Sequence, residues 1–436
     1  HLADGTYAKD VIWWEIASHY EKKTPGILKD LLRIREKRAG NNSLKKEAAK
    51  RLFGDVLYGS VTRFEQYVQC PFAFFSHYGL LLNERQQYEI SSLDHGNLFH
   101  QAMEHLSHEL EQRNKNWQDL SEEEAVLLAA ECVDAVAERY QGRKYFQSNR
   151  VSFMLKRLKN EVVHSVWAMW HQMQEGDFVQ TYTEKGFRGN DKEWESMCIP
   201  FGEDAKICLN GVIDRVDLCS LPGEELIKVI DYKSSDSQDL SLAKVYYGLQ
   251  MQLLTYLEAA KEMVEKEHKG KEAVPAAMLY YAIKEKNLDW KPESEEEYEK
   301  RVLDSMKCKG YVNEEPEIIG HLDKSVVNGG ELIPGQKSGV VPVAVDKKGL
   351  LKKNSGTLST KDFETLIAHT KEKMKECGKG ILDGKIEAIP YVYEDNEGCT
   401  YCPYGSVCGH ESKKDGVREM KKMSDDEVWE ALYGDD

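Results

Sequence analysis

The sequence has no hydrophobic run long enough to cross a membrane. No stretch reaches the roughly 18 consecutive apolar residues that a transmembrane helix needs, and no secretory signal peptide is visible. Internal repeats are also absent. The apolar fraction of 41% and the charged fraction of 31% are typical of globular proteins. The 436 residues are therefore expected to form a soluble intracellular protein, either as one large domain with insertions or as two domains.

An excess of positive charge is missing as well. The formal net charge is −16, whereas a protein that coats nucleic acid without regard to its sequence needs a positive surface for the phosphates. The composition therefore argues against that class of nucleic-acid binder. A local basic groove, or a site at which metal ions offset carboxylates, remains compatible with it.

Ten cysteines are present, but without a secretory signal a framework of disulfides is not expected. Metal or cluster ligation suits the clustered ones better, and Cys399, Cys402 and Cys408 form a C-x2-C-x5-C array that lacks a fourth ligand. The other cysteines are assigned no function, and those in strand-like runs are expected to be small buried hydrophobic residues. These unassigned cysteines, apart from Cys70, are Cys132, Cys198, Cys208, Cys219, Cys308 and Cys377.

Hydrophobic periodicity predicts a helical first half followed by a sheet. Short β-prone segments broken by glycine, proline and aspartate predict a meander between about 178 and 235. A single helix over 242–266 and a buried strand over 276–283 are expected after it. The helical segments of the first half are 59–82, which leads into Cys70-Pro71, and 93–110, 121–140 and 151–175.

The last third of the chain is predicted to be more irregular. Residues 284–358 are polar and rich in glycine, which indicates a long insertion with a hairpin rather than part of the core. A capped helix over 359–378 precedes the cysteine array. The acidic residues after Glu411 are expected to form a peripheral helical tail.

Two carboxylates and a lysine stand out in the predicted sheet. Asp214 lies in the strand GVIDRVD, and after a turn Asp231 and Lys233 end the strand VIDYK. Strand alternation places Asp231 and Lys233 on one face, where they converge with Asp214 of the adjacent antiparallel strand. Two carboxylates, helped by the carbonyl of Tyr232, suit an octahedral Mg²⁺ or Mn²⁺, and the lysine can orient or deprotonate a metal-bound water. The implied reaction is metal-assisted hydrolysis of a phosphodiester.

A surface hairpin in which aspartate and lysine pair across strands is the alternative interpretation, worth under about 1 kcal/mol. The context favours the metal site. The mostly apolar run from Leu226 to Ile230 indicates a buried central strand, and charges at the end of such a strand need a partner such as a metal ion. Asp217 and Arg215 are interpreted as structural because alternation turns Asp217 away from Asp214.

The succession of motifs resembles that of the RecB-type nucleases of the PD-(D/E)XK superfamily. The residues that carry the resemblance are His100 in HGNLFH, Asp214, Asp231 and Lys233, and Gln252 with Tyr256 in QLLTY, in that order. With CPFAFF near the start and the cysteine array near the end, the chain is similar to the nuclease domain of the AddB family over roughly 56–412. One departure is that Ile213 precedes Asp214 where the superfamily's name has proline.

The resemblance implies an α/β (α+β) fold of the restriction-endonuclease type, a mixed central sheet flanked by helices. It implies that His100 is a metal ligand beside Asp214 and Asp231, and that Lys233 activates or positions the attacking water. Gln252 and Tyr256, four residues apart on one helix face, would support Lys233 and the substrate phosphate.

The resemblance also supplies a fourth cysteine. Cys70 would join Cys399, Cys402 and Cys408 around a [4Fe-4S] cluster that staples the start of the domain to its end. Four thiolates suit zinc equally well, so the family and not the spacing favours iron and sulfur.

The function implied is that of a Mg²⁺-dependent single-strand DNA exonuclease domain in a helicase-nuclease of double-strand break repair by recombination, in the bacterial cytoplasm. An AddA-type helicase-nuclease is the implied partner. Residues 1–55 would be the helical remnant of an upstream helicase-like region, 56–412 the nuclease domain, and 413–436 the tail. The alternatives are a CRISPR-adaptation or nuclease-helicase type of iron-sulfur nuclease, and a non-catalytic DNA-binding module stapled by a cluster or zinc.

Overall fold

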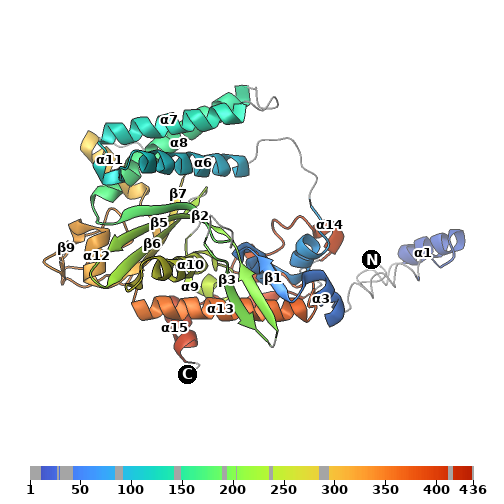
Figure 1. Ribbon diagram of the computed structural model, residues 1–436. Coiled ribbons are helices and arrows are strands. Elements are labelled where there is room, and N and C mark those ends of the chain that lie inside the picture. Colours follow the sequence, from blue (N-terminus) through green and yellow to red (C-terminus); the bar gives the residue numbers. More distant parts are fainter. Residues whose placement is uncertain are drawn as a thin grey trace. The chain divides into compact units, whose positions relative to one another are not determined.

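The computed structural model describes residues 11–26, 29, 43–83, 92–141, 149–188, 194–202, 204–234, 239–283, 294–410 and 416–434. Within it the chain forms two units, which are taken one at a time below (Figure 1). The smaller unit comprises 1–55, 66–84 and 377–421. The larger unit comprises 56–65, 85–376 and 422–436.

A six-stranded mixed sheet forms the centre of the larger unit, in the order β11-β8-β7-β6-β5-β2. The pairs β6–β7 and β8–β11 are parallel and the other neighbours are antiparallel. The central strands are almost wholly buried, as the apolar run of β6 predicts. The strands are β2 (Val179–Gly186), β5 (Val212–Ser220), β6 (Glu224–Lys233), β7 (Glu272–Ala282), β8 (Lys309–Asn313) and β11 (Thr357–Leu358).

Helices cover both faces of this sheet (Figure 1). On one face, α6 (Ser92–Gln112), α7 (Glu122–Gln141) and α8 (Asn149–Gln174) share a hydrophobic core with Ile230 and Tyr232 of β6. On the other, α10 (Gln252–Glu267) packs against β6 and β7, which its crossover connects. The predicted mixed sheet flanked by helices is confirmed.

The helix predicted over 242–266 is wrong in one respect that matters for the site. It is two helices, α9 (Leu242–Tyr246) and α10, because the chain leaves helical geometry at Gly248, where φ is +78°. A glycine adopts such a φ without steric cost. The apolar periodicity continues across this break, so periodicity alone did not indicate it. Gln252 consequently stands at the first position of a helix rather than in its middle.

The prediction that 284–358 stays outside the core is also wrong. Strands β8 and β11 extend the central sheet, and Val340 and Val341 join its hydrophobic core. The expected hairpin is present as β9 (Val327–Asn328) and β10 (Glu331–Leu332). Short apolar runs between polar turns supply the buried residues, and overall polarity concealed them. The helices of this region are α11 (Glu295–Ser305) and α12 (Pro316–Leu322).

A second, three-stranded sheet of the larger unit has the order β1-β4-β3. Here Cys198 and Cys208 form a disulfide, contrary to the expectation that both are free. They are direct cross-strand partners with Cα atoms 4.2 Å apart, so the register of β3 and β4 brings the two sulfurs together. The strands are β1 (Val56–Gly59), β3 (Met197–Phe201) and β4 (Ala205–Leu209).

The smaller unit is built from three separated segments of the chain. Its sheet has the order β13-β12-β14, and Arg418 of β14 donates hydrogen bonds to the carbonyls of Val68, Gln69 (3.2 Å) and Ile389 (2.9 Å). This guanidinium therefore fixes the chain directly before Cys70. The elements are α1 (Val11–Lys23), α3 (Lys46–Phe53), α5 (Pro71–Phe74), a π-helical turn (Phe75–Gly79), β12 (Tyr391–Tyr393), β13 (Asn396–Glu397), α14 (Gly405–Cys408) and β14 (Arg418–Met420).

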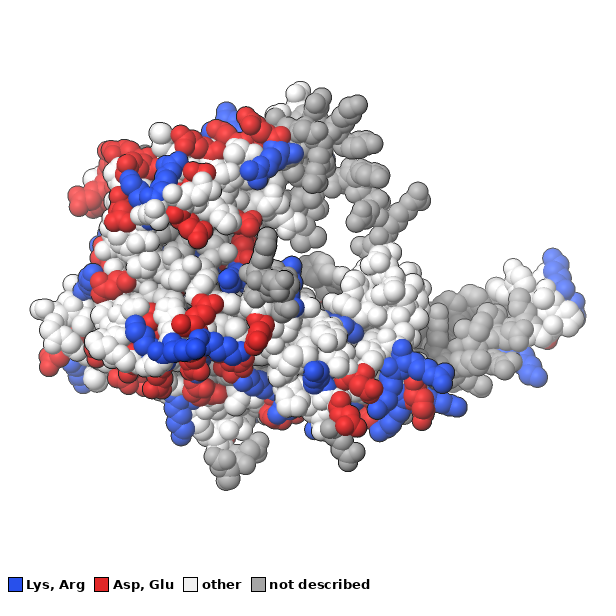
Figure 2. Space-filling view, in the orientation of Figure 1, with Lys and Arg blue, Asp and Glu red and all other residues white. Residues whose placement is uncertain are grey.

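Two helices run from one unit's residues into the other's, α4 (Val61–Gln69) and α13 (Thr360–Leu382), and α15 (Asp425–Tyr433) belongs to the larger unit. Among the described helices, none combines the length and apolarity that a bilayer crossing requires. Figure 2 shows acidic and basic side chains interspersed over the visible face of the larger unit. On that face the excess negative charge is therefore not gathered into one acidic patch.

A buried ion network crosses the middle of the central sheet. Arg215 Nε donates to Asp217 Oδ1 at 2.7 Å, and Lys228 Nζ of the neighbouring strand lies 2.8 Å from Asp217 Oδ2. Asp217 and Arg215 are at most 1% exposed. Because one carboxylate compensates two cations here, removing it leaves both buried charges without a partner.

Asp217→Ala is accordingly expected to lower the free energy of unfolding by about 3–5 kcal/mol. Lys353→Ala is the control, because Lys353 pairs with Asp426 at an exposed surface and such pairs contribute little. Urea unfolding followed by circular dichroism measures both. A loss for Asp217→Ala no larger than that for Lys353→Ala would contradict the role of the buried network.

Candidate metal centres

Asp214 and Asp231 are buried carboxylates on the neighbouring strands β5 and β6. Their residues are 7% and 2% exposed. Asp214 Oδ2 accepts a hydrogen bond of 2.6 Å from the backbone N–H of Tyr232, which lies between Asp231 and Lys233. The two carboxylates predicted from the sequence are thus brought together by the pairing of β5 with β6.

Lys233 stands within a set of polar side chains. Its Nζ lies 2.5 Å from Asp231 Oδ2, donates to Gln252 Oε1 at 2.9 Å, and lies 5.2 Å from the centre of the Tyr280 ring. Gln252 Nε2 in turn donates to the hydroxyl of Tyr256 at 2.9 Å. The structure therefore joins the predicted Lys233, Gln252 and Tyr256 in one hydrogen-bonded chain.

His100 of α6 reaches the same place from another element. Its Nδ1 lies 2.8 Å from Glu184 Oε1 and 3.6 Å from Asp214 Oδ1. One ligand atom each of His100, Glu184 and Asp214 lies within 4.8 Å of the others, an arrangement that can hold a metal ion. His100 is therefore brought to the carboxylates, as predicted.

Glu184 is a residue of this site that the sequence analysis missed. It lies on β2, whose register against β5 shifts between Gln180 and Tyr182, and its own φ is +46°. A shift of this kind reverses which side chains face the site, so alternation could not place Glu184. A glutamate with positive φ is unusual, and such backbone strain is common at functional sites.

The electrostatics of the site favour a bound cation. Burial and the charge of Asp231 hold the pKa of Asp214 well above its usual range. Burial also raises the pKa of Asp231, although Lys233 opposes this. Burial opposes protonation of His100, but the hydrogen bond to Glu184 and the charge of Asp214 outweigh it, so the pKa of His100 is raised. Oxygen-rich ligands around uncompensated negative charge fit a hard divalent ion such as Mg²⁺ or Mn²⁺.

Glu65 is the second residue that the sequence analysis did not single out. Its Oε1 accepts a hydrogen bond of 2.7 Å from the backbone N–H of Met251, at the start of α10. Burial raises the pKa of this carboxyl to about 7, while the backbone N–H groups of Met251 and Gln252 and the charge of Lys233 act in the opposite direction. Glu65 belongs to α4, so only the tertiary fold brings it here.

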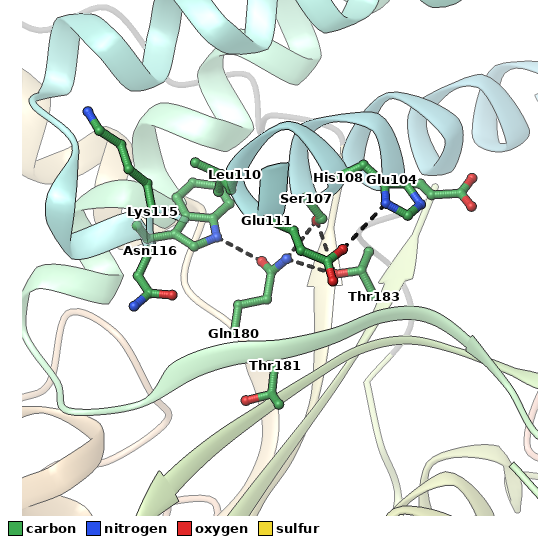
Figure 3. A pocket seen from close by; sticks show the side chains of 11 residues that line it. Glu104, Ser107, His108, Leu110, Glu111, Lys115, Asn116, Gln180, Thr181 and Thr183 are labelled. Carbon is green, nitrogen blue, oxygen red and sulfur yellow. Dashed lines mark hydrogen bonds and ion pairs between the residues drawn. The ribbon is translucent and has the colours of Figure 1, made fainter. Parts of the chain in front are cut away.

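A hollow of about 190 Å³ lies further along α6 and β2 (Figure 3). Gln180 stands at its centre: it accepts from Trp117 Nε1 at 2.8 Å and donates to Ser107 Oγ and Thr183 Oγ1 at 2.6 and 2.7 Å. His108 pairs with Glu111 on its rim, at 3.6 Å. His108 thus provides a histidine on the same helix as His100 but with a different partner.

The smaller unit contains the four cysteines predicted to act together. Cys70 is buried at the start of α5 and packs in one cluster with Cys402 and Tyr404. Burial, Glu397 and the charges of Cys70, Cys402 and Cys408 raise the pKa of Cys399 to about 11. The other three sulfurs are therefore within electrostatic range of Cys399, and a set of four thiols fits either an iron-sulfur cluster or zinc.

Two further potential ligands lie beside this array. A ligand atom of Glu397, one of His410 and Cys399 Sγ are within 4.8 Å of one another. Neither Glu397 nor His410 was predicted as a site residue. The cysteine array therefore has neighbours that could compete with a thiolate for a metal ion.

Comparison with known families identifies the fold. The family model described as the PD-(D/E)XK nuclease superfamily matches residues 59–409. The chain belongs to this superfamily. The match includes both the carboxylate site and the cysteine array up to Cys408, and it confirms the predicted fold class and the resemblance to nucleases of the PD-(D/E)XK type.

Curated relatives of this PD-(D/E)XK chain are named as the B-type component of an ATP-dependent helicase/deoxyribonuclease. The protein of Lachnoclostridium phytofermentans is 35% identical over 90% of this chain and 33% of its own length. That of Alkaliphilus metalliredigens is 30% identical over 97% and 36%, and that of Clostridium perfringens 32% identical over 90% and 34%. The chain thus spans about a third of the length of these relatives.

Asp214→Asn is expected to raise the melting temperature of the metal-free protein by a few degrees at pH 8. A carboxyl with a raised pKa in the fold is ionised at a cost at high pH. This cost disappears as the pH falls through the folded-state pKa, because the carboxyl then takes up a proton. The difference between variant and wild type should therefore shrink on acidification.

Asp177→Asn is the matched control for that melting experiment. Burial opposes ionisation of Asp177, but Lys324 and His321 outweigh it and lower its pKa, so this carboxylate stabilises the fold at pH 8. Its variant should melt at a lower temperature than wild type. A loss of stability for Asp214→Asn like that of the control would show that Asp214 is an ordinary structural carboxylate.

Proposed function

We propose that this chain is a Mg²⁺-dependent deoxyribonuclease domain that hydrolyses single-stranded DNA from an end. The observation that carries the proposal is the convergence of His100, Asp214, Asp231 and Lys233 in one buried cluster of a chain that belongs to a nuclease superfamily. A surface hairpin would leave these charges in water, whereas here both aspartates are buried.

The side chains of the cluster divide the chemical work. His100, Asp214 and Asp231 would hold the divalent ion, with Glu184 beside them, and the bound ion would supply Lewis acidity and lower the pKa of a water. Lys233 orients or deprotonates the attacking water, because its ammonium is directed by Asp231 on one side and Gln252 on the other. Tyr256 holds Gln252 in place and stands ready to contact the substrate phosphate.

The setting of this activity is inferred from the relatives. Their name describes part of an ATP-dependent helicase and deoxyribonuclease, so the substrate of this domain would be a strand delivered by unwinding. The partner would be an AddA-type helicase-nuclease, and the process double-strand break repair by recombination in the bacterial cytoplasm.

A [4Fe-4S] cluster on Cys70, Cys399, Cys402 and Cys408 is the second part of the proposal. Its role is structural, since hydrolysis of a phosphodiester needs no electron transfer. Cys70 and the array come from two segments about 330 residues apart in the chain, so a cluster would close a very long loop and restrict the unfolded chain. Thiolate ligation would offset the cost of keeping four thiols close together.

Lys233→Met is expected to lower the rate of Mg²⁺-dependent cleavage of an end-labelled single strand by at least about 100-fold. Asp231→Asn should abolish the dependence on Mg²⁺, because it removes a ligand. His100→Ala should raise the Mg²⁺ concentration needed for half the maximal rate, while His108→Ala, on the same helix, should not. Cleavage that survives Lys233→Met and Asp231→Asn would leave the DNA-binding module as the better interpretation.

Anaerobically purified protein is expected to contain about four iron and four sulfide per chain, with broad absorbance near 400 nm. Cys402→Ala should lose the iron, whereas Cys132→Ala, which removes a buried cysteine of α7, should keep it. Stoichiometric zinc in place of iron would contradict the cluster and indicate a zinc site, with Glu397 and His410 as candidate ligands.

A further inference from the structure

The N-terminus of α10 lacks an acceptor of its own. The residue before its first turn is Met251, whose side chain cannot accept hydrogen bonds from the free backbone N–H groups. Serine, threonine, aspartate or asparagine usually stands at such a position. The neighbouring helix α9 follows that rule, because Ser241 Oγ accepts from the N–H of Lys244.

Glu65 supplies the missing acceptor from a distant part of the sequence. Its Oε1 accepts from Met251 N at 2.7 Å across a separation of 186 residues. The N–H of Gln252 also stabilises this carboxylate. A carboxylate at a helix N-terminus has two favourable effects, since it satisfies N–H groups and lies at the positive end of the helix dipole.

The capped turn is the one that carries the support of Lys233. Gln252 is the first residue of α10, and its Oε1 is only 2.9 Å from Lys233 Nζ. A side chain in a frayed first turn cannot hold a fixed distance to its partner. The position of Lys233 therefore depends on how firmly the start of α10 is held.

We propose that Glu65 is a positioning residue of the nuclease site, which fixes the start of α10 and through Gln252 the ammonium of Lys233. This inference rests on the proposed function for its effect on catalysis. Its structural part, the capping of α10, stands without it. The role depends on the reach of the side chain and on an acceptor oxygen, not on its charge.

Two substitutions separate reach from charge. Glu65→Gln keeps the length and one acceptor oxygen but removes the charge, whereas Glu65→Asp keeps the charge and is one methylene shorter. Glu65→Gln should cleave within about threefold of the wild-type rate, while Glu65→Asp should lose on the order of 10- to 100-fold in the single-turnover rate at saturating Mg²⁺. Should Glu65→Asp fold poorly, Glu65→Ala gives the same comparison without a displaced charge.

Ser294→Ala is the matched control, because it removes the cap of α11, a helix outside the site. It should leave the cleavage rate unchanged. The double variant Glu65→Asp/Gln252→Ala should be scarcely slower than Gln252→Ala alone, since both changes break one chain of contacts. The Mg²⁺ concentration for half the maximal rate should not move in any Glu65 variant.

Hydrogen exchange tests the capping without any need for activity. The amides of Met251 and Gln252 should exchange at least about tenfold faster in Glu65→Asp and remain protected in Glu65→Gln. A wild-type chain that does not cleave DNA would overturn the proposed function, and the exchange data would still decide whether Glu65 holds α10. Equal exchange in both variants, an active Glu65→Asp, or losses that multiply in the double variant would overturn the positioning role.

Discussion

The burial of two neighbouring carboxylates, Asp214 and Asp231, is the constraint on which the larger unit depends. Two like charges out of water raise each other's pKa and cost stability. The fold answers with several compensations in one place: the N–H of Tyr232, the ammonium of Lys233 and the imidazole of His100. A protein retains such an arrangement where its chemistry needs it, and a divalent cation would complete the compensation.

The elements around this pair serve to position its partners. The antiparallel hairpin of β5 and β6 sets the carboxylates side by side, α6 brings His100, and the crossover to β7 brings Gln252 and Tyr256. The break before α10 is what makes the last step work, since it turns Gln252 toward Lys233 at the start of a helix. In the smaller unit the four cysteines would play the corresponding part for chain segments that are distant in sequence.

Local patterns were enough to predict part of this site. Strand alternation and a turn indicated Asp214, Asp231 and Lys233, and the order of motifs indicated His100, Gln252 and Tyr256. Glu184 and Glu65 escaped because a register shift in β2 and a contact across 186 residues have no local signature. The break at Gly248 was hidden by apolar periodicity that continues through it. The disulfide between Cys198 and Cys208 depends on strand register, which cellular redox conditions do not reveal.

The central claim is that the carboxylate cluster is a metal site. Its most direct test is a crystal structure of the chain with Mn²⁺, examined in an anomalous difference map. A peak is expected about 2.0–2.3 Å from oxygens of Asp214 and Asp231 and from a ring nitrogen of His100. Data of good quality at saturating Mn²⁺ with no peak there, or with Mn²⁺ bound only elsewhere, would contradict it.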